Sequence, residues 1–89
     1  MRAVITVIGR DTVGIISRVS AYLAEKQINI VDITQSVISE FFCMVMLVDL
    51  RASTEPFSDT VDALTAIGRE SNLEIHVMHE DIFNSMHKI

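Results

Sequence analysis

Residues 2–9 form a run of apolar and β-branched side chains that is apolar on both alternating faces. One face would carry Ala3, Ile5 and Val7, and the other would carry Val4, Thr6 and Ile8. A strand that is apolar on both faces is typical of the interior of a sheet, because both faces are then covered. The pattern therefore predicts a central strand at the start of this sequence.

The hydrophobic period becomes helical after Gly14. Apolar residues then recur at spacings of three and four, at Ile15, Val19, Tyr22 and Leu23. This spacing predicts an amphipathic helix that ends in the polar residues 25–27. Asp11 or Thr12 is the predicted N-cap, because a short side-chain oxygen can accept a hydrogen bond from an amide of the first turn.

Two more strands are predicted over residues 28–39 and 41–50, joined by a short polar connection at Ser39 and Glu40. The first changes phase near Val31 and Asp32: apolar positions before that point share one face, and later ones continue on the opposite face. We expect a β-bulge there, because one extra residue shifts every following side chain to the other face. The second strand is apolar on both faces, which predicts another interior strand.

The remaining pattern predicts a second helix, a last strand and a short amphipathic tail. After the linker 51–55, the helix would bury one stripe and stop within residues 68–72. The stripe consists of Phe57, Val61, Leu64 and Ile67. Residues 73–79 alternate as a strand, whose inward residues would be Leu73, Ile75 and Val77. In the tail 80–89, one helical face would carry Ile82, Phe83 and Met86.

The order strand, helix, strand, strand, helix, strand predicts an α+β fold of the ferredoxin-like βαββαβ kind. It would form one domain over residues 1–89, with a four-stranded antiparallel sheet, two helices on one face and the helical tail. Because both helices lie on one face, the other face, with Val4, Thr6, Ile8 and the neighbouring residues of the third strand, is expected to lack cover within one chain.

Composition favours a chain that associates with a second copy or a ligand. The 89 residues are 49% hydrophobic, with a mean hydropathy of +0.39. A domain of this size buries only about 60–65% of the surface of its unfolded chain, so some apolar surface is left for a partner. A chain this small also has no second domain with which to close a cleft, which argues against a monomeric enzyme.

The net charge, the lack of a long apolar run and the single cysteine bear on the partners and the cellular location of the protein. The formal net charge of −5 argues against nucleic acid as a partner, since the phosphates would be repelled. No apolar run is long enough for a secretory signal or a membrane span. The single Cys43 cannot form an intramolecular disulfide. Together these features predict a cytoplasmic protein with no membrane association.

Three kinds of chemistry are disfavoured by the residues. Cys43 lies in an apolar run with no base nearby in sequence, which predicts an inert core residue rather than a nucleophile. His76 and His79 are three apart on a strand and would lie on opposite faces, and His87 lies in the tail, so we expect no metal site. RNA-binding domains with this topology stack bases on aromatic residues of the central strands, and the first strand has none.

The turn at residues 9–14 is the strongest candidate site. Its two glycines lead directly into a helix N-terminus, where free amides can hold a carboxylate. Asp11 could receive an amino group, and Asn29 at the start of the second strand offers a donor and an acceptor. A zwitterionic amino acid needs this combination of groups. The alternative is a glycine-permitted turn with a capping Asp11 and no ligand.

The same residues resemble those of the ACT domain family. The turn Gly9-Arg10-Asp11-Thr12-Val13-Gly14-Ile15 is similar to the family's G-x-D-x-P-G-[IL] turn, and Gln27-Ile28-Asn29-Ile30 is similar to its G-[VI]-N-I segment. The tail at 80–89 resembles the closing E-D-I-F-x-x-M-H-x-I of free-standing single-domain members related to the glycine cleavage regulator.

This resemblance implies a non-catalytic regulatory module that binds a small amino acid without a cofactor. Ligand contacts in serine-binding members map onto Gly9, Asp11 and Asn29, at an interface between two domains. Gly9 stands where those members carry histidine, and Val13 stands where the family usually has proline. The candidate ligand-binding residues are Gly9, Arg10, Asp11, Thr12, Val13, Gly14, Asn29 and Ile30.

The resemblance also implies a homodimer, formed by sheets packed side by side or face to face, that signals allosterically to a protein partner. A competing hypothesis is a dimerisation or protein-interaction domain whose turn holds no ligand, favoured by Gly9 in place of a ligand-bearing side chain. A third hypothesis, an enzyme similar to acylphosphatase, would use Arg10 to hold a phosphate. It is disfavoured because no spacing brings Asn29 over a substrate in that turn.

Overall fold

The computed structural model describes residues 1–10 and 14–86 and has the predicted order of elements. The strands are β1 (Arg2–Arg10), β2 (Asn29–Ile38), β3 (Phe41–Asp49) and β4 (Glu74–His79). The helices are α1 (Ile15–Glu25), α2 (Phe57–Ser71) and α3 (Glu80–Met86). The predicted ferredoxin-like α+β fold is confirmed.

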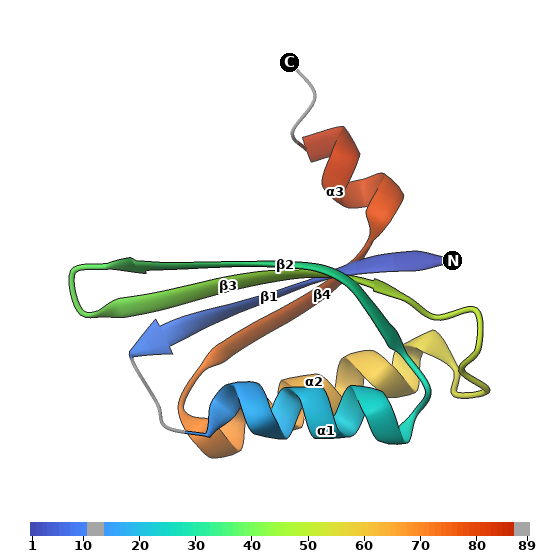
Figure 1. The fold of residues 1–89 in the computed structure, drawn as a ribbon, viewed down its shortest axis with the longest axis horizontal. Helices are drawn as coiled ribbons and strands as arrows, with labels where there is room; N and C mark the ends of the chain where they lie inside the picture. The colour runs from blue at the N-terminus through green and yellow to red at the C-terminus, as the bar shows by residue number, and fades with distance from the viewer. Residues whose placement is uncertain (11–13, 87–89) are drawn as a thin grey trace.

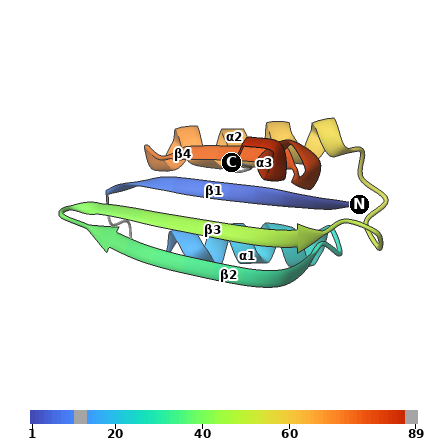
Figure 2. The same cartoon turned by 90° about the horizontal axis from the view of Figure 1, so that it is seen from above.

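The four strands form one antiparallel sheet in the order β2-β3-β1-β4 (Figure 2). The two strands that are apolar on both faces, β1 and β3, occupy the interior positions, as their patterns predict. The predicted bulge is present, because the register of β2 on β3 shifts between Ile30 and Asp32. Val31 is the extra residue, and the shift returns Ile33 to the face that Ile30 occupies.

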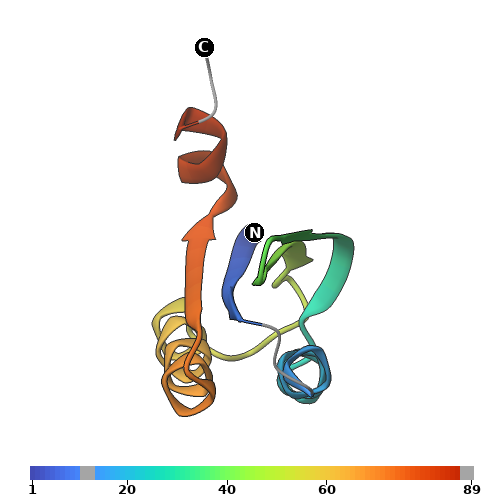
Figure 3. The ribbon, with the colours of Figure 1, turned by 90° about the vertical axis from the view of Figure 1, so that its left-hand side faces the viewer.

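Helices α1 and α2 cover one face of the sheet, and α3 projects from the other (Figure 1, Figure 3). The core lies between the sheet and the two long helices. Its fully buried large side chains include Ile5, Leu23, Met44, Met46 and Leu64. The inward residues predicted for β4 also belong to it, since Leu73 and Ile75 are buried and Val77 packs against them.

The buried stripe of α2 is only partly as predicted. Its buried residues are Thr60, Leu64 and Gly68, whereas Phe57 and Ile67 lie at the border of the core and Val61 is half-buried. Gly68 lies against β4: a Cβ there would stand 2.9 Å from the carbonyl oxygen of Leu73. The close approach of helix and strand therefore turns a small residue into a core position that the hydrophobic pattern does not reveal.

The start of α1 also differs from the prediction. Its N-cap is Gly14, in the left-handed region with φ 87°, and no side chain among residues 1–10 and 14–86 caps the first turn. The predicted caps, Asp11 and Thr12, lie outside the described residues. Glycine is suited to this position because it has no Cβ to clash in the left-handed conformation.

The sheet face opposite α1 and α2, here called the open face, is not uniformly uncovered. Along β1 it carries Arg2, Val4, Thr6, Ile8 and Arg10, paired with the odd-numbered residues of β3. Val4 is only 4% exposed, so the prediction that it lacks cover within one chain is wrong. Val4 is flanked by Leu47 and Met78 on the neighbouring strands, and α3, at the end of β4, contacts β1 and β4. Ile8, farther along β1, is exposed as expected.

Candidate functional site

The end of β1 borders an open cleft of about 720 Å³. Gly9 and Arg10 line it from the sheet, and the turn between α2 and β4 closes the other side. That turn contributes Arg69, Asn72 and Glu74 to the lining. Two of the predicted site residues therefore line a cleft together with the α2–β4 turn, which lies about 60 positions later in the chain.

The cleft carries charges of both signs. Arg10 forms an ion pair with Glu40, with its Nε 3.3 Å from the carboxylate, and most of its side chain stays exposed. The Arg69 side chain has no ion-pair partner within residues 1–10 and 14–86. Glu74 adds a carboxylate to the same lining. The sequence pattern gave no sign of Arg69 and Glu74, because only the α2–β4 turn brings them to the end of β1.

Arg18 fixes the position of the turn beside the cleft. Its guanidinium donates hydrogen bonds to Ser71 and to Glu70, each with a donor–acceptor distance of 2.8 Å. These contacts join α1 to the end of α2. The C-terminus of α2 is closed by Asn72, in the left-handed conformation, and by the amide of Leu73, which donates to the carbonyl of Gly68 over 2.8 Å.

The side chain of Leu73 packs so closely against Gly9 that it leaves no space for a Cβ at this position. A Cβ at this position would overlap Cδ2 of Leu73 and stand 3.5 Å from its Cα. The position at which the resemblance expects a ligand-binding histidine is therefore filled from the other side by a buried leucine. Any side chain at Gly9 requires Leu73 to move.

Gly14 lies at the start of α1, exposed to solvent, and its carbonyl accepts the first helical hydrogen bond, from Arg18 N over 3.0 Å. The predicted site residues Asp11, Thr12 and Val13 between β1 and Gly14 lie outside the described residues. The described part of the predicted turn therefore consists of Gly9, Arg10 and Gly14.

Asn29 and Ile30 lie at the opposite end of the sheet. Asn29 pairs with Asp49, which pairs with Arg2 at the start of β1, whereas Gly9 pairs with Phe42 at the other end of the same two strands. Phe42 and Asp49 are seven residues apart on β3. At a rise of about 3.3 Å per residue, Gly9 and Asn29 therefore lie about 23 Å apart along the sheet. Asn29 is exposed, and Ile30 is half-buried against the core. One chain therefore does not bring Asn29 to Gly9 and Arg10.

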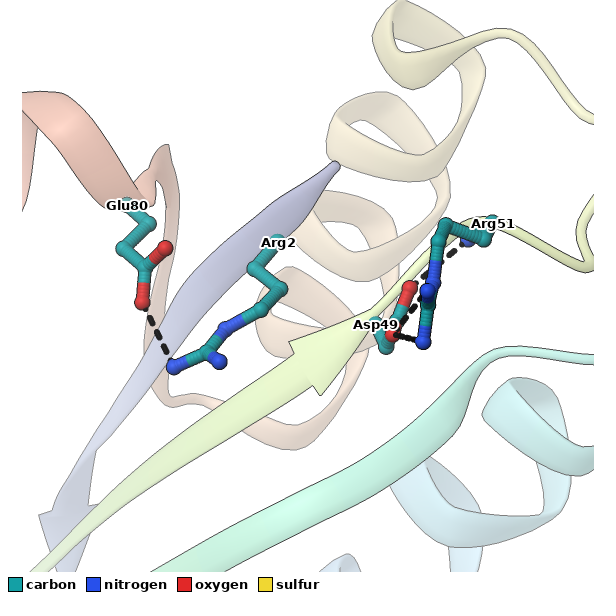
Figure 4. A network of polar contacts seen from close by, with 4 residues as sticks. All are labelled: Arg2, Asp49, Arg51 and Glu80. Carbon is teal, nitrogen blue, oxygen red and sulfur yellow. Dashed lines mark hydrogen bonds and ion pairs between the residues drawn. The ribbon is translucent and has the colours of Figure 1, made fainter.

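Ion pairs surround the end of the sheet at which Asn29 lies (Figure 4). Arg2 donates to Glu80 of α3, with 2.7 Å between Nη2 and Oε2. Asp49 accepts hydrogen bonds from the amide and from the Nε of Arg51, each with a donor–acceptor distance of 2.9 Å. The bond from the Arg51 amide, followed by that from its side chain, lowers the pKa of Asp49.

A second polar cluster joins α1 to the linker before α2. The hydroxyl of Tyr22 donates to Oε1 of Glu55 over 2.6 Å, and Lys26 lies 3.4 Å from the other oxygen of that carboxylate. Partial burial and then this hydrogen bond raise the pKa of Tyr22 to about 12. The arrangement has the character of a structural contact, because all three groups are satisfied by one another.

The candidate metal ligands and Cys43 lie apart on the sheet in the described ranges. No group of three or more His, Cys, Asp or Glu residues there is placed to hold a metal ion. His76 and His79 lie on opposite faces of β4, since they pair with Thr6 and Ala3. Cys43 is half-buried on the open face, not in the core as predicted. Within residues 1–10 and 14–86, no helix combines the length and apolar character needed to cross a bilayer.

Known proteins similar to this chain agree with the resemblance. The model of the ACT domain family matches residues 2–78. A UPF0237 protein of Listeria innocua is 47% identical over 89 residues, which is 100% of both chains. The solved ACT domain protein from Streptococcus pneumoniae has a TM-score of 0.81 and 36% identity, with 93% of each chain covered.

A crystal structure described as a glycine cleavage system transcriptional repressor is also similar, and it is the longer chain. It has 26% identity and a TM-score of 0.70, over 89% of this chain and 47% of that one. The relation to a glycine cleavage regulator that the tail motif implied is thus confirmed. With the family model covering most of its length and a full-length relative at 47% identity, the chain belongs to the ACT domain family, whose members are regulatory ligand-binding modules.

Proposed function

We propose that this chain is a cytoplasmic regulatory module that binds a small free amino acid as a homodimer and catalyses no reaction. The observation that carries this function is the cleft beside Gly9 and Arg10, which offers charges of both signs. An α-amino acid is a zwitterion, and a site for it needs a cation and an anion a few ångströms apart. The solved relative named for repression of glycine cleavage supports an amino acid as the signal.

The charged groups of the cleft suit the two ends of such a ligand. The guanidinium groups of Arg10 and Arg69 can donate to the carboxylate, because the planar fork of arginine matches two carboxylate oxygens. The carboxylate of Glu74 can accept from the ammonium group. The amide of Asn72 can contact a polar ligand side chain, so this position would tune which amino acid is preferred.

Asn29 enters the site from a second copy in this proposal. The end of the sheet that holds Asn29 is about 23 Å from Gly9 within one chain, so the two can meet only between chains. A two-fold axis that reverses the strand direction places Asn29 of one copy at the Gly9 end of the other. The ligand would then report on dimer geometry, and a protein partner would respond to that geometry.

Isothermal titration with a panel of free amino acids tests the proposal. We expect heat from at least one small amino acid at millimolar concentration or below. Arg69→Gln and Asn29→Ala should each weaken binding at least tenfold, because each removes a hydrogen bond to a charged group. Asp62→Asn is the control, since it removes one charge from an exposed side chain of α2 outside the cleft. No heat from any amino acid would remove the ligand claim.

A complementation experiment tests whether two copies share the site. Arg69→Gln and Asn29→Ala chains, each defective alone, are mixed and allowed to exchange subunits. About half of the dimers are then mixed, and each has one site with both residues intact. Recovery of binding supports a shared site. Absence of recovery, in chains shown to exchange, contradicts it.

The second candidate function is a dimerisation or protein-interaction domain that binds no ligand. Its supporting observation is Leu73, which occupies the space where a side chain at Gly9 would lie. This candidate predicts a dimer whose stability does not change with any amino acid. Thermal unfolding with and without the panel separates the two functions, because a ligand bound only by the folded state raises the midpoint.

A further inference from the structure

Glu74, the first residue of β4, belongs both to the cleft and to the open face of the sheet. It lines the cleft, and its partner across the sheet is Ile8 on the open face. His76, two positions later on the same strand, lies on the same face, because side chains alternate along a strand. Its Nε2 atom lies 3.4 Å from Oε2 of Glu74. A carboxylate of the cleft is therefore within ion-pair distance of an imidazole.

Glu74 is the one ion-pair partner of His76 among residues 1–10 and 14–86. Because β4 is an edge strand, β1 alone flanks it in the sheet, and the residue of β1 opposite His76 is the uncharged Thr6. Helix α2 covers the other face of β4 (Figure 1). The charged residues at that end of α2 are Arg69, which lines the cleft, and Glu70, which pairs with α1.

The other charged groups near β4 have partners of their own. On the open face of β1, Arg2 and Arg10 are each four positions from Thr6, and each forms an ion pair with a glutamate. Helix α3 contacts β4, but its Asp81 lies beside His79 on the opposite face of that strand. The charge of His76 therefore acts chiefly on Glu74.

We propose that His76 makes amino-acid binding at the cleft depend on pH, because its protonated ring competes with the ammonium group of the amino acid for Glu74. The proposal rests on the proposed function, in which Glu74 accepts from that ammonium group. Histidine changes its charge between pH 5 and 8. A neutral His76 leaves the carboxylate to the amino acid, and a protonated His76 pairs with it.

The competition is one of charge. Glu74 has two carboxylate oxygens, so it can accept from an imidazole and an ammonium group at once. A protonated His76 nevertheless places a second positive charge beside the same carboxylate, and like charges a few ångströms apart repel. Arg10 and Arg69 already bring two guanidinium groups to the cleft lining. The amino acid is therefore bound more weakly in acid.

Solvent limits the size of the effect. The side chains of His76 and Glu74 are 61% and 76% exposed, so water screens their interaction. Ion pairs between exposed groups change an equilibrium constant by up to about fivefold. We expect a graded response to pH rather than complete loss of binding.

Isothermal titration of the full chain with glycine, L-alanine and L-serine at two pH values tests the proposal. The dissociation constant of an amino acid that binds should be about two- to fivefold higher at pH 5.5 than at pH 7.5. His76→Gln should reduce the difference to within about 1.5-fold, because glutamine is polar but does not titrate. Any other titrating group would still act in this variant.

Proton release gives a second measurement. Near pH 6.5, binding should release protons from the unchanged chain, because the bound ammonium group disfavours the protonated ring by the same coupling. The release is measured from the change in binding heat between buffers of different ionisation enthalpy. His76→Gln should show less release than the unchanged chain, and equal release in both contradicts the proposal.

His79→Gln is the matched control. It removes a histidine from the same strand, but from the opposite face and outside the cleft. Glutamine keeps an oxygen that can accept from the amide of Asp81, as Nδ1 of His79 does. This variant should keep the dependence on pH. Dependence that survives His76→Gln, or that disappears in His79→Gln, contradicts the proposal.

The pH dependence and the proposed function can fail separately. A dissociation constant that is equal at both pH values, or lower at pH 5.5, contradicts the role of His76 and leaves amino-acid binding in place. No heat from any of the three amino acids at either pH contradicts both.

Discussion

Leu73 lies so close to Gly9 that a Cβ on the glycine would overlap its Cδ2 atom. Gly9 is near the end of β1, and Leu73 precedes β4 on the adjacent edge of the sheet. The leucine is buried on the helix-facing side, where it belongs to the core. The contact therefore seals the end of the core beside the cleft, and it leaves no space for a side chain at position 9 unless Leu73 moves.

Gly9→Ala should destabilise the fold by about 1–3 kcal/mol, because an extra methyl group forces a packed side chain to move. The free energy of unfolding is measured by urea denaturation. The matched background is Leu73→Ala, which by itself should cost about 2–5 kcal/mol. In that background Gly9→Ala should cost much less, and equal costs in both backgrounds would show that Leu73 is not the obstacle.

Gly14→Ala should cost about 1 kcal/mol for a different reason. No atom of the described residues beyond its chain neighbours lies within 4 Å of a Cβ there, but its φ of 87° is left-handed. A side chain in that conformation approaches the following carbonyl. Gly14→Asn should cost less than alanine, because asparagine tolerates the left-handed region. The order of the two urea midpoints checks this, and alanine equal to glycine would contradict it.

Tyr22→Phe should destabilise the protein by about 1 kcal/mol at pH 7, since it removes the hydrogen bond to Glu55. The pKa of Tyr22 is raised to about 12 in the folded state, above its ordinary value near 10. The phenol therefore stabilises the fold fully below pH 10, and this contribution is lost as the pH rises from 10 to 12.

The tyrosine titration can be read without a variant. Tyr22 is the one tyrosine of the sequence, and there is no tryptophan, so tyrosinate absorbance reports this residue alone. We expect a midpoint near pH 12 in the folded protein and near pH 10 in urea. A midpoint near pH 10 under folding conditions would mean that neither the partial burial of Tyr22 nor its contact with Glu55 holds in solution.

Asp49→Asn should weaken the fold at neutral pH more than in acid. The amide and guanidinium of Arg51 lower the pKa of Asp49, so its contribution to stability is present above about pH 4 and is lost as the pH falls through the folded pKa. Urea midpoints of the variant and the unchanged protein should converge below pH 4. Asp62→Asn, which removes an exposed carboxylate from α2, is the control for the substitution itself.

Local pattern determined the architecture of this protein. The two doubly apolar segments became the interior strands β1 and β3, and the phase change near Val31 became the bulge. The helical period after Gly14 became α1, with Ile15, Val19 and Leu23 buried. These features could be predicted because the periods of strand and helix decide which side chains share a face before any long-range contact forms.

What lies on each face was decided by tertiary structure. The period of α2 pointed to a stripe with Val61, but the approach of β4 buries Gly68 in the core. The pattern predicted that Val4 is uncovered, but Val4 is buried in the folded chain, in which α3 contacts β1 and β4. Both outcomes depend on how elements far apart in the chain pack, which no local period encodes.

Some residues of the candidate site could be identified from the sequence, and others only from the fold. The sequence by itself identified the family turn with Gly9 and Arg10, and it identified Asn29 as a polar residue at the start of β2. Only the fold brought Arg69 and Glu74 to the cleft and separated Asn29 from it by most of the length of the sheet. The physical reason is that strand pairing sets positions along the sheet by register, whereas residue type reports only which chemistry is available.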